Sequence, residues 1–233
     1  MGYRKIPLTN NEFYHIYNRG NSKQKIFLNG QDYDRFIKLL YVCNSIKQIS
    51  FRDDIVEKKI DAWDFDRKEE IVSIGAWVLM PNHFHIYITF PEDRLRGLQR
   101  EQEENNISVF MRKVCTSYSK YFNLKYKRTG SLFENRFKSV RIENDIQAKY
   151  LFSYIHLNPI KLIDSKWKEN GLKNKKGTKD FLKKYLWSSY LDHKGVIRSE
   201  NKILNKKGFP KYFKNIKDFD SEIEEWLTFS ESE

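Results

Sequence analysis

The stretch Met80-Pro81-Asn82-His83-Phe84-His85-Ile86-Tyr87-Ile88 contains a turn pair followed by a run of aromatic and β-branched residues. This order is typical of a hairpin whose turn leads into a β-strand. Alternate side chains of a strand point to the same face, so His83 and His85 would project side by side, while the residues between them face a core. Imidazole is the most common protein metal ligand and is costly to bury without partners. The stretch therefore predicts a divalent metal held by His83 and His85.

The elements before and after this strand predict an α+β fold. Each is indicated by the period of its apolar residues, which is two in strands and 3.6 in helices. In chain order they are strand 12–19, helix 32–48, strand 71–80, the histidine strand, helix 106–122, strand 131–142, and a helix capped by Asn144 or Asp145 that ends near Pro159. The first six match the split βαβ, ferredoxin-like arrangement, an antiparallel sheet with helices on one face. The other face, with His83 and His85, would be open to a ligand.

Two charged stretches interrupt this pattern. Residues 50–70 contain several carboxylates, but no histidine or tight ligand spacing accompanies them. A solvated extension is therefore expected there rather than a metal site. Residues 92–106 are expected to form a charged loop or a short helix. His15, in the first strand, is interpreted as structural more readily than as part of a site.

The last third of the chain has a different character. Residues 166–184 are rich in lysine, and Gly171 and Gly177 would interrupt regular structure, so an exposed basic segment is expected. Trp187-Ser188-Ser189-Tyr190 is predicted to fold back on the core as an aromatic anchor. One or two further helices are expected over residues 200–229.

The composition limits the classes of protein to consider. The 233 residues have a net charge of +12, which favours a polyanionic partner such as nucleic acid or an anionic membrane surface. Cys43 and Cys115 are interpreted as buried free thiols of a reducing compartment. The sequence has no secretory signal and no apolar run of the roughly 20 residues that a membrane helix needs. A cytoplasmic protein is expected, with a core domain over 1–163 and a basic, helical C-terminal extension over 164–233 that packs on it.

Partners for the two histidines are expected on the helix before Pro159. Tyr154 and Asn158 are four residues apart, so they would share one helical face. A free phenol has a pKa near about 10 and is a weak nucleophile at neutral pH. A hard divalent ion could polarise a phosphodiester beside it, and attack by a tyrosine would divide strand transfer into two transesterifications. Alternatively, Tyr154 simply packs against its neighbours.

Five blocks of sequence, in this order, resemble the single-tyrosine HUH transposases, and particularly the REP-associated tyrosine transposase branch. Together they span roughly residues 12–190. The blocks are Tyr14-His15-Ile16-Tyr17-Asn18-Arg19-Gly20, Ala76-Trp77-Val78-Leu79-Met80-Pro81-Asn82-His83-Phe84-His85, Gly130-Ser131-Leu132-Phe133-Glu134-Asn135-Arg136-Phe137-Lys138, Tyr154-Ile155-His156-Leu157-Asn158-Pro159 and Trp187-Ser188-Ser189-Tyr190. The resemblance covers neither the charged connection 50–70 nor the tail beyond Tyr190.

The resemblance implies a fold, a chemistry and a set of residues. Residues 1–163 would form an HUH catalytic domain that cleaves and rejoins single-stranded DNA near a hairpin. His83, His85 and Asn158 would bind Mg²⁺ or Mn²⁺, and Tyr154 would take the 5′-phosphate of the cleaved strand without ATP. The implied DNA contacts are Arg19, Lys127, Arg128, Arg136 and Lys138. Relatives act as monomers or as homodimers, so both states stay open.

Two other functions compete with this reading. A non-catalytic nucleic-acid-binding module could also combine a ferredoxin-like sheet with a basic surface, but it would not need paired histidines. A zinc hydrolase fits less well, because two histidines and an amide are a poor zinc set. If Tyr154 were not the nucleophile, Tyr150 and Tyr118 would be the neighbouring candidates.

Overall fold

The computed structural model describes residues 7–90, 105–213 and 215–228. The predicted loop or short helix at 92–106 therefore lies almost entirely outside the described residues. The strands are β1 (Phe13–Arg19), β2 (Ser73–Met80), β3 (His83–Thr89) and β4 (Lys138–Ile142). The helices are α1 (Gly30–Val42), α2 (Asn106–Lys125), α3 (Asp145–Leu157), α4 (Trp167–Asn170), α5 (Lys175–Lys184), α6 (Tyr190–His193) and α7 (Ile216–Thr228).

The four strands form one antiparallel sheet in the order β2-β3-β1-β4. With α1 between β1 and β2, and α2 between β3 and β4, this is the ferredoxin-like order, so the predicted α+β fold is confirmed. The hairpin turn at Pro81-Asn82 joins β2 to β3, and the backbone carbonyl of Asn82 accepts a hydrogen bond from the Gly20 amide (2.8 Å). This bond ties the hairpin to the end of β1.

The first face of the sheet packs on α1 and α2. Phe84, Ile86 and Ile88 of β3 point to this face and are fully buried with the apolar side chains of both helices. Helix α1 begins at a capping box, in which the Asn29 side chain accepts from the backbone of Asp32 and the Asp32 carboxylate accepts in return. The helix was predicted over 32–48 with Asp32 as its cap, but it spans Gly30–Val42, is capped by Asn29, and has Asp32 as its third residue.

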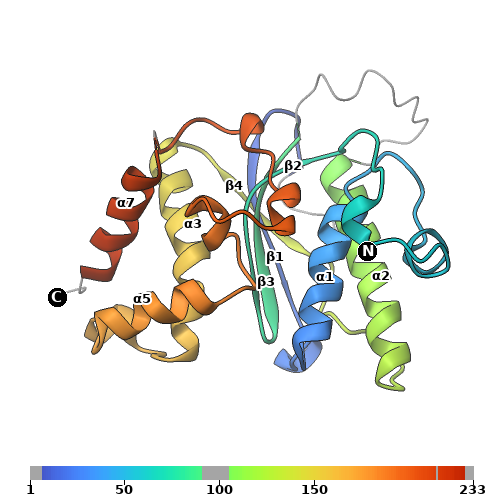
Figure 1. The fold of residues 1–233 in the computed structure, drawn as a ribbon, viewed down its shortest axis with the longest axis horizontal. Helices are drawn as coiled ribbons and strands as arrows, with labels where there is room; N and C mark the ends of the chain where they lie inside the picture. Colours follow the sequence, from blue (N-terminus) through green and yellow to red (C-terminus); the bar gives the residue numbers. More distant parts are fainter. Residues whose placement is uncertain (1–6, 91–104, 214, 229–233) are drawn as a thin grey trace.

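The second face is only partly open, which corrects the expectation of a free face. Figure 1 shows α3, α5 and α7 on the side of the sheet opposite α1 and α2. Ala76, Val78 and Tyr87 point to this side and are buried in a second core with α3, α5 and α7. Strand β2 has apolar side chains on both faces, so both faces must be buried against other parts of the protein. The basic extension supplies much of that cover.

Two further predictions of secondary structure need correction. The strand expected over 131–142 begins only at Lys138, because residues 131–137 form an irregular loop in which Phe133 makes an isolated bridge to Gly20. The basic segment 166–184 is largely helical, since α5 runs through Gly177. The Asn174 side chain caps that helix by accepting from the Gly177 amide (2.9 Å), and the helix buries Leu182.

Candidate functional site

The two histidines of β3 lie side by side on the second face, as the strand alternation predicts. Their ring centroids are 5.0 Å apart, and the rings stand nearly perpendicular, at 81°. His85 is 6% exposed and His83 is half-buried. Register explains the position: His83 is opposite Met80 of β2 and Arg19 of β1, and His85 is opposite Val78 and Tyr17.

Helix α3 brings Tyr154 and Asn158 to these histidines within one chain. The helix is capped by Asn144, whose side chain accepts from the Gln147 amide (2.9 Å). The Tyr154 ring lies 5.3 Å from that of His85, centroid to centroid, in an edge-to-face arrangement. Asn158 follows one turn later, in the helical conformation, and is 2% exposed. The predicted meeting of the helix with the histidine strand is therefore present in the structure.

Two buried polar groups at this meeting point lack hydrogen-bond partners among the described residues. They are Nε2 of His85 and the side-chain amide of Asn158. Asn158 is still near enough to raise the pKa of His83 and to lower that of Tyr154, although burial dominates both shifts. Two imidazole nitrogens and one amide oxygen make a donor set that suits Mg²⁺ or Mn²⁺ in an open site. The residues present thus fit the divalent ion that the sequence predicts.

The protonation states at neutral pH follow from burial. Burial, with a smaller contribution from the nearby Lys161 ammonium, lowers the pKa of His83 to about 4. Burial also brings the pKa of His85 well below its usual range, and it raises the pKa of Tyr154. Both imidazoles are therefore neutral, with a lone pair available, and the phenol is protonated.

Two lysines close to Tyr154 were not identified from the sequence. The Nζ atoms of Lys161 and Lys168 lie 5.5 Å and 5.1 Å from the centre of its ring. Lys168 is also within 6.0 Å of the ring centres of Tyr150 and Trp226, so cation–π contacts hold its ammonium in place. Burial and the charge of Lys168 lower the pKa of Lys161. The candidate nucleophile thus lies beside two cations that repel each other.

Two more side chains touch the histidines, and the sequence indicated a site role for neither. Nε2 of His15 is 2.9 Å from Nδ1 of His85, and Oδ1 of Asn82 is 2.6 Å from Nδ1 of His83. The interpretation of His15 as a structural residue needs revision, because His15 directly contacts His85, a candidate metal ligand. This contact joins residues 70 positions apart and depends on strand register, so no local pattern could have revealed it.

The predicted DNA contacts occupy different places. Lys138 is opposite Tyr17 in the sheet and is exposed at the edge of the histidine face. Arg19 is opposite His83, but its guanidinium is paired with Glu134 (Nη2 to Oε1, 2.8 Å). Lys127 and Arg128 follow α2, the helix of the first face, and Arg128 packs over the Phe122 ring. Arg136 is exposed in the loop before β4.

The alternative nucleophiles differ in access. Tyr118 is fully buried on the first face, and its hydroxyl donates to the carbonyl of Ile26. Tyr150 is 47% exposed and stacks on Tyr154, with centroids 6.3 Å apart and rings inclined by 16°. Tyr118 is thus removed from the candidates, and Tyr150 becomes the natural control for Tyr154.

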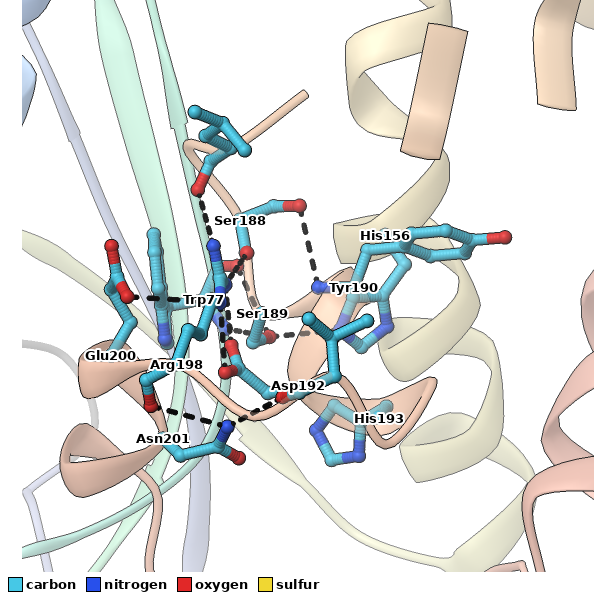
Figure 2. Close-up of polar contacts among 12 residues, drawn as sticks. Trp77, His156, Ser188, Ser189, Tyr190, Asp192, His193, Arg198, Glu200 and Asn201 are labelled. Carbon is cyan, nitrogen blue, oxygen red and sulfur yellow. Dashed lines mark hydrogen bonds and ion pairs between the residues drawn. The ribbon is translucent and has the colours of Figure 1, made fainter. Parts of the chain in front are cut away.

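A second histidine cluster joins His156 of α3 to the segment that pairs with Trp77 of β2 (Figure 2). We call it the anchor cluster; its members are His156, Ser189, Asp192, His193 and Arg198. Nε2 of His156 is 2.8 Å from Oγ of Ser189, and Nε2 of His193 is 3.0 Å from the carbonyl of Gly75. A serine bonded to a histidine is the core of many hydrolase sites, but both residues here are 0% exposed. No substrate can reach them.

The anchor cluster instead covers the free edge of β2. The Ser189 amide donates to the carbonyl of Trp77, and Oγ of Ser189 accepts from the Trp77 amide, each at 2.9 Å. Asp192 forms a two-point ion pair with Arg198, whose Nε is 2.9 Å from Oδ1. The predicted anchoring by Trp187-Ser188-Ser189-Tyr190 is thus realised through backbone pairing with an edge strand.

Comparisons with known proteins support the fold. No protein-family model and no curated protein sequence matches this chain. Among solved structures, the chain is similar to one described as the REP-associated tyrosine transposase bound to a REP hairpin. The TM-score is 0.50 and the identity 15%, over 86% of this chain and 90% of that one. Among the described residues, no helix combines the length and apolarity that crossing a membrane requires. The likeness establishes a shared fold.

Proposed function

We propose that this protein is a transposase-like enzyme that cleaves and rejoins single-stranded DNA near a hairpin. Tyr154 is the nucleophile, and His83, His85 and Asn158 hold a divalent ion, Mg²⁺ or Mn²⁺. The observation that supports this most strongly is the meeting of all four residues within one chain, at the open part of the second face. A second copy is not needed to complete the site, so a monomer would be competent.

The substrate class is inferred from charge and from the structural neighbour. The neighbour is described as bound to a REP hairpin, which shows that a protein of this fold can hold hairpin DNA. The net charge of +12 favours a nucleic acid, and Lys138, Lys161 and Lys168 lie around the histidine face. We extend the hairpin substrate to this chain on these grounds.

The proposed reaction conserves the number of phosphate ester bonds. Oη of Tyr154 attacks the scissile phosphorus, a P–O bond to the phenol forms, and the bond to the 3′ oxygen breaks. The proton of the phenol is lost, and the departing 3′ oxygen takes up a proton. Rejoining reverses these steps with another 3′-hydroxyl as the nucleophile, so neither ATP nor water is consumed.

The residues around Tyr154 address the two difficulties of this step. The raised pKa of the phenol makes it a poor nucleophile, and the phosphodiester gains charge as it is attacked. The ammonium groups of Lys161 and Lys168 are placed to stabilise negative charge on both partners. A bound divalent ion would polarise the phosphodiester and stabilise the same charge.

A covalent-adduct assay tests the proposal. The protein is incubated in Mn²⁺ with labelled single-stranded hairpin oligonucleotides from around its own gene, and denaturing gels are searched for a protein–DNA band. We expect a band that a chelator prevents and that Tyr154→Phe abolishes. Tyr150→Phe is the matched control, because it removes the same hydroxyl one helical turn earlier and should leave the band.

Two results would count against the enzyme. An adduct that persists in Tyr154→Phe would show that another group attacks. The alternative of a non-catalytic nucleic-acid-binding module would be favoured if a chelator left DNA binding unchanged and no tested hairpin gave an adduct.

A further inference from the structure

Both candidate ligand histidines form a hydrogen bond through the same ring atom. Nδ1 of His83 is 2.6 Å from Oδ1 of Asn82, and Nδ1 of His85 is 2.9 Å from Nε2 of His15. A neutral imidazole has one N–H and one lone pair, so whatever fixes Nδ1 also fixes the state of Nε2. The two partners come from different places, the hairpin turn and strand β1.

The Asn82 contact determines the proton on His83. Nδ2 of Asn82 donates to the carbonyl of Lys23 (3.2 Å), which fixes the orientation of the amide and turns Oδ1 toward His83. A carbonyl oxygen only accepts, so Nδ1 of His83 must be the donor. Its Nε2 then has the lone pair. The Ile26 amide donates a hydrogen bond to the carbonyl of Pro81 (2.8 Å). This backbone bond fixes the turn, and with it the position of Asn82 beside His83.

The His15 contact allows either direction, but burial selects one. Nε2 of His85 is buried and has no partner among the described residues. An N–H at that position would be a buried donor without an acceptor, which is unfavourable. With the proton on Nδ1, His85 donates to Nε2 of His15 and keeps its Nε2 lone pair. The ring centroids of His15 and His85 are 5.0 Å apart, close enough for the two rings to hold each other's orientation.

We propose that Asn82 and His15 are positioning residues that hold His83 and His85 in the tautomer protonated at Nδ1, so that both Nε2 atoms are free to bind one divalent cation. This inference rests on the metal site of the proposed function and adds the residues that prepare it. Partners of this kind orient a ligand and raise its basicity, and their loss typically weakens metal binding by about 10–100-fold.

Metal affinity in the absence of DNA is the first test. Mn²⁺ binding is measured by calorimetry for the wild type, His15→Leu, His15→Gln and Val140→Ala. Val140 is opposite His15 on β4 and is 47% exposed, so it controls for a change on the same face. We expect His15→Leu to bind about 10–100-fold more weakly, His15→Gln to recover most of the affinity through its amide oxygen, and Val140→Ala to match the wild type.

The outcomes separate the inference from the proposed function. If the wild type binds no Mn²⁺, the metal site fails and the inference fails with it. If the wild type binds and His15→Leu binds equally well, only the inference fails. Recovery by His15→Gln would argue against a general loss of packing, which that variant would not repair.

A second measurement uses only the wild-type protein, so its result does not depend on whether a variant folds. Nitrogen-15 NMR of the metal-free wild type distinguishes protonated from unprotonated ring nitrogens. We expect His83 and His85 each to show a protonated Nδ1 and an unprotonated Nε2. A protonated Nε2 on either histidine would overturn the assignment for that residue.

Discussion

Two histidine clusters lie against helix α3, and they differ in their access from solvent: His83 and Tyr154 are partly exposed, whereas His156 and Ser189 are 0% exposed. On one side, Nε2 of His85 has no partner in the described part of the chain and lies beside a half-buried phenol. On the other, His156 is bonded to Ser189 and His193 to a backbone carbonyl. Burial brings the histidine pKa values below their usual range in both clusters.

The comparison shows that burial and a displaced pKa do not by themselves indicate a functional site. In the anchor cluster, Ser189 forms hydrogen bonds with the edge strand β2, and both Ser189 and His156 are 0% exposed. At the site of His83, His85, Tyr154 and Asn158, His83 and Tyr154 are partly exposed, and the exposed Lys161 lies beside the Tyr154 ring. Nδ1 of His156 in the anchor cluster also lacks a partner among the described residues, so an unpartnered ring nitrogen does not separate the two clusters. Access from solvent, rather than residue type, separates them.

The largest expected effect is the loss of adduct formation when a candidate metal ligand, His85, is removed. His85→Ala should reduce adduct formation by at least about 1,000-fold, equivalent to about 4 kcal/mol in the barrier. Its unfolding free energy should fall by about 1–3 kcal/mol, because a buried ring and its hydrogen bond to His15 are lost. Adduct yield and thermal unfolding are measured on the same preparation. Retained cleavage would disprove the ligand role.

The anchor cluster should show the opposite pattern. Arg198→Leu leaves the fully buried Asp192 carboxylate without its partner, which is expected to cost about 3–5 kcal/mol of unfolding free energy. Protein that remains folded should still form the adduct. Lys207→Leu, a change at an exposed lysine of the same C-terminal extension, is the control and should alter stability little. Normal stability of Arg198→Leu in chemical denaturation would show that the cluster is not an anchor.

A pH titration of stability should sharpen the same contrast. Burial, helped by Lys206, lowers the pKa of His193 to about 3, against about 6.5 in the unfolded chain. Below pH 6.5 the unfolded state therefore binds the extra proton, and the unfolding free energy falls by up to about 1.4 kcal/mol per pH unit for this histidine. His193→Gln should reduce the slope by one proton between pH 6 and pH 4, in denaturant melts, compared with the wild type. An unchanged slope would contradict the buried neutral state.

A smaller effect is expected from the lysines beside Tyr154. Lys168→Met should slow adduct formation by about 10-fold, or about 1.4 kcal/mol, because a charge near the reacting phosphate is lost. Lys168→Arg should keep most of the rate, and Lys166→Met, an exposed neighbour, should keep all of it. Rates are measured with saturating DNA, so that weaker binding is not mistaken for slower chemistry. Equal rates for all three variants would remove Lys168 from the mechanism.

The sequence predicted the parts of the molecule that depend on local period. The histidine strand, the helix with Tyr154 and Asn158, and the β-α-β-β-α-β order all follow from spacings within one element. It failed where the answer depends on distant segments. The contact between His15 and His85 requires the register of β1 on β3, and the placement of Lys168 requires α3, α4 and α7 together. The irregular loop at 131–137 was missed because its alternating residues imitate a strand.

The central claim is that Tyr154 forms a covalent bond with DNA, and peptide mapping of the adduct tests it most directly. The hairpin oligonucleotide is labelled with a different dye at each end, the adduct is isolated and digested, and the modified peptide is sequenced by mass spectrometry. We predict that the dye of the 3′ fragment, which has the 5′-phosphate, stays with the protein and that the modified residue is Tyr154. Attachment to Tyr150 or any other residue, or retention of the 5′ fragment instead, would contradict the account.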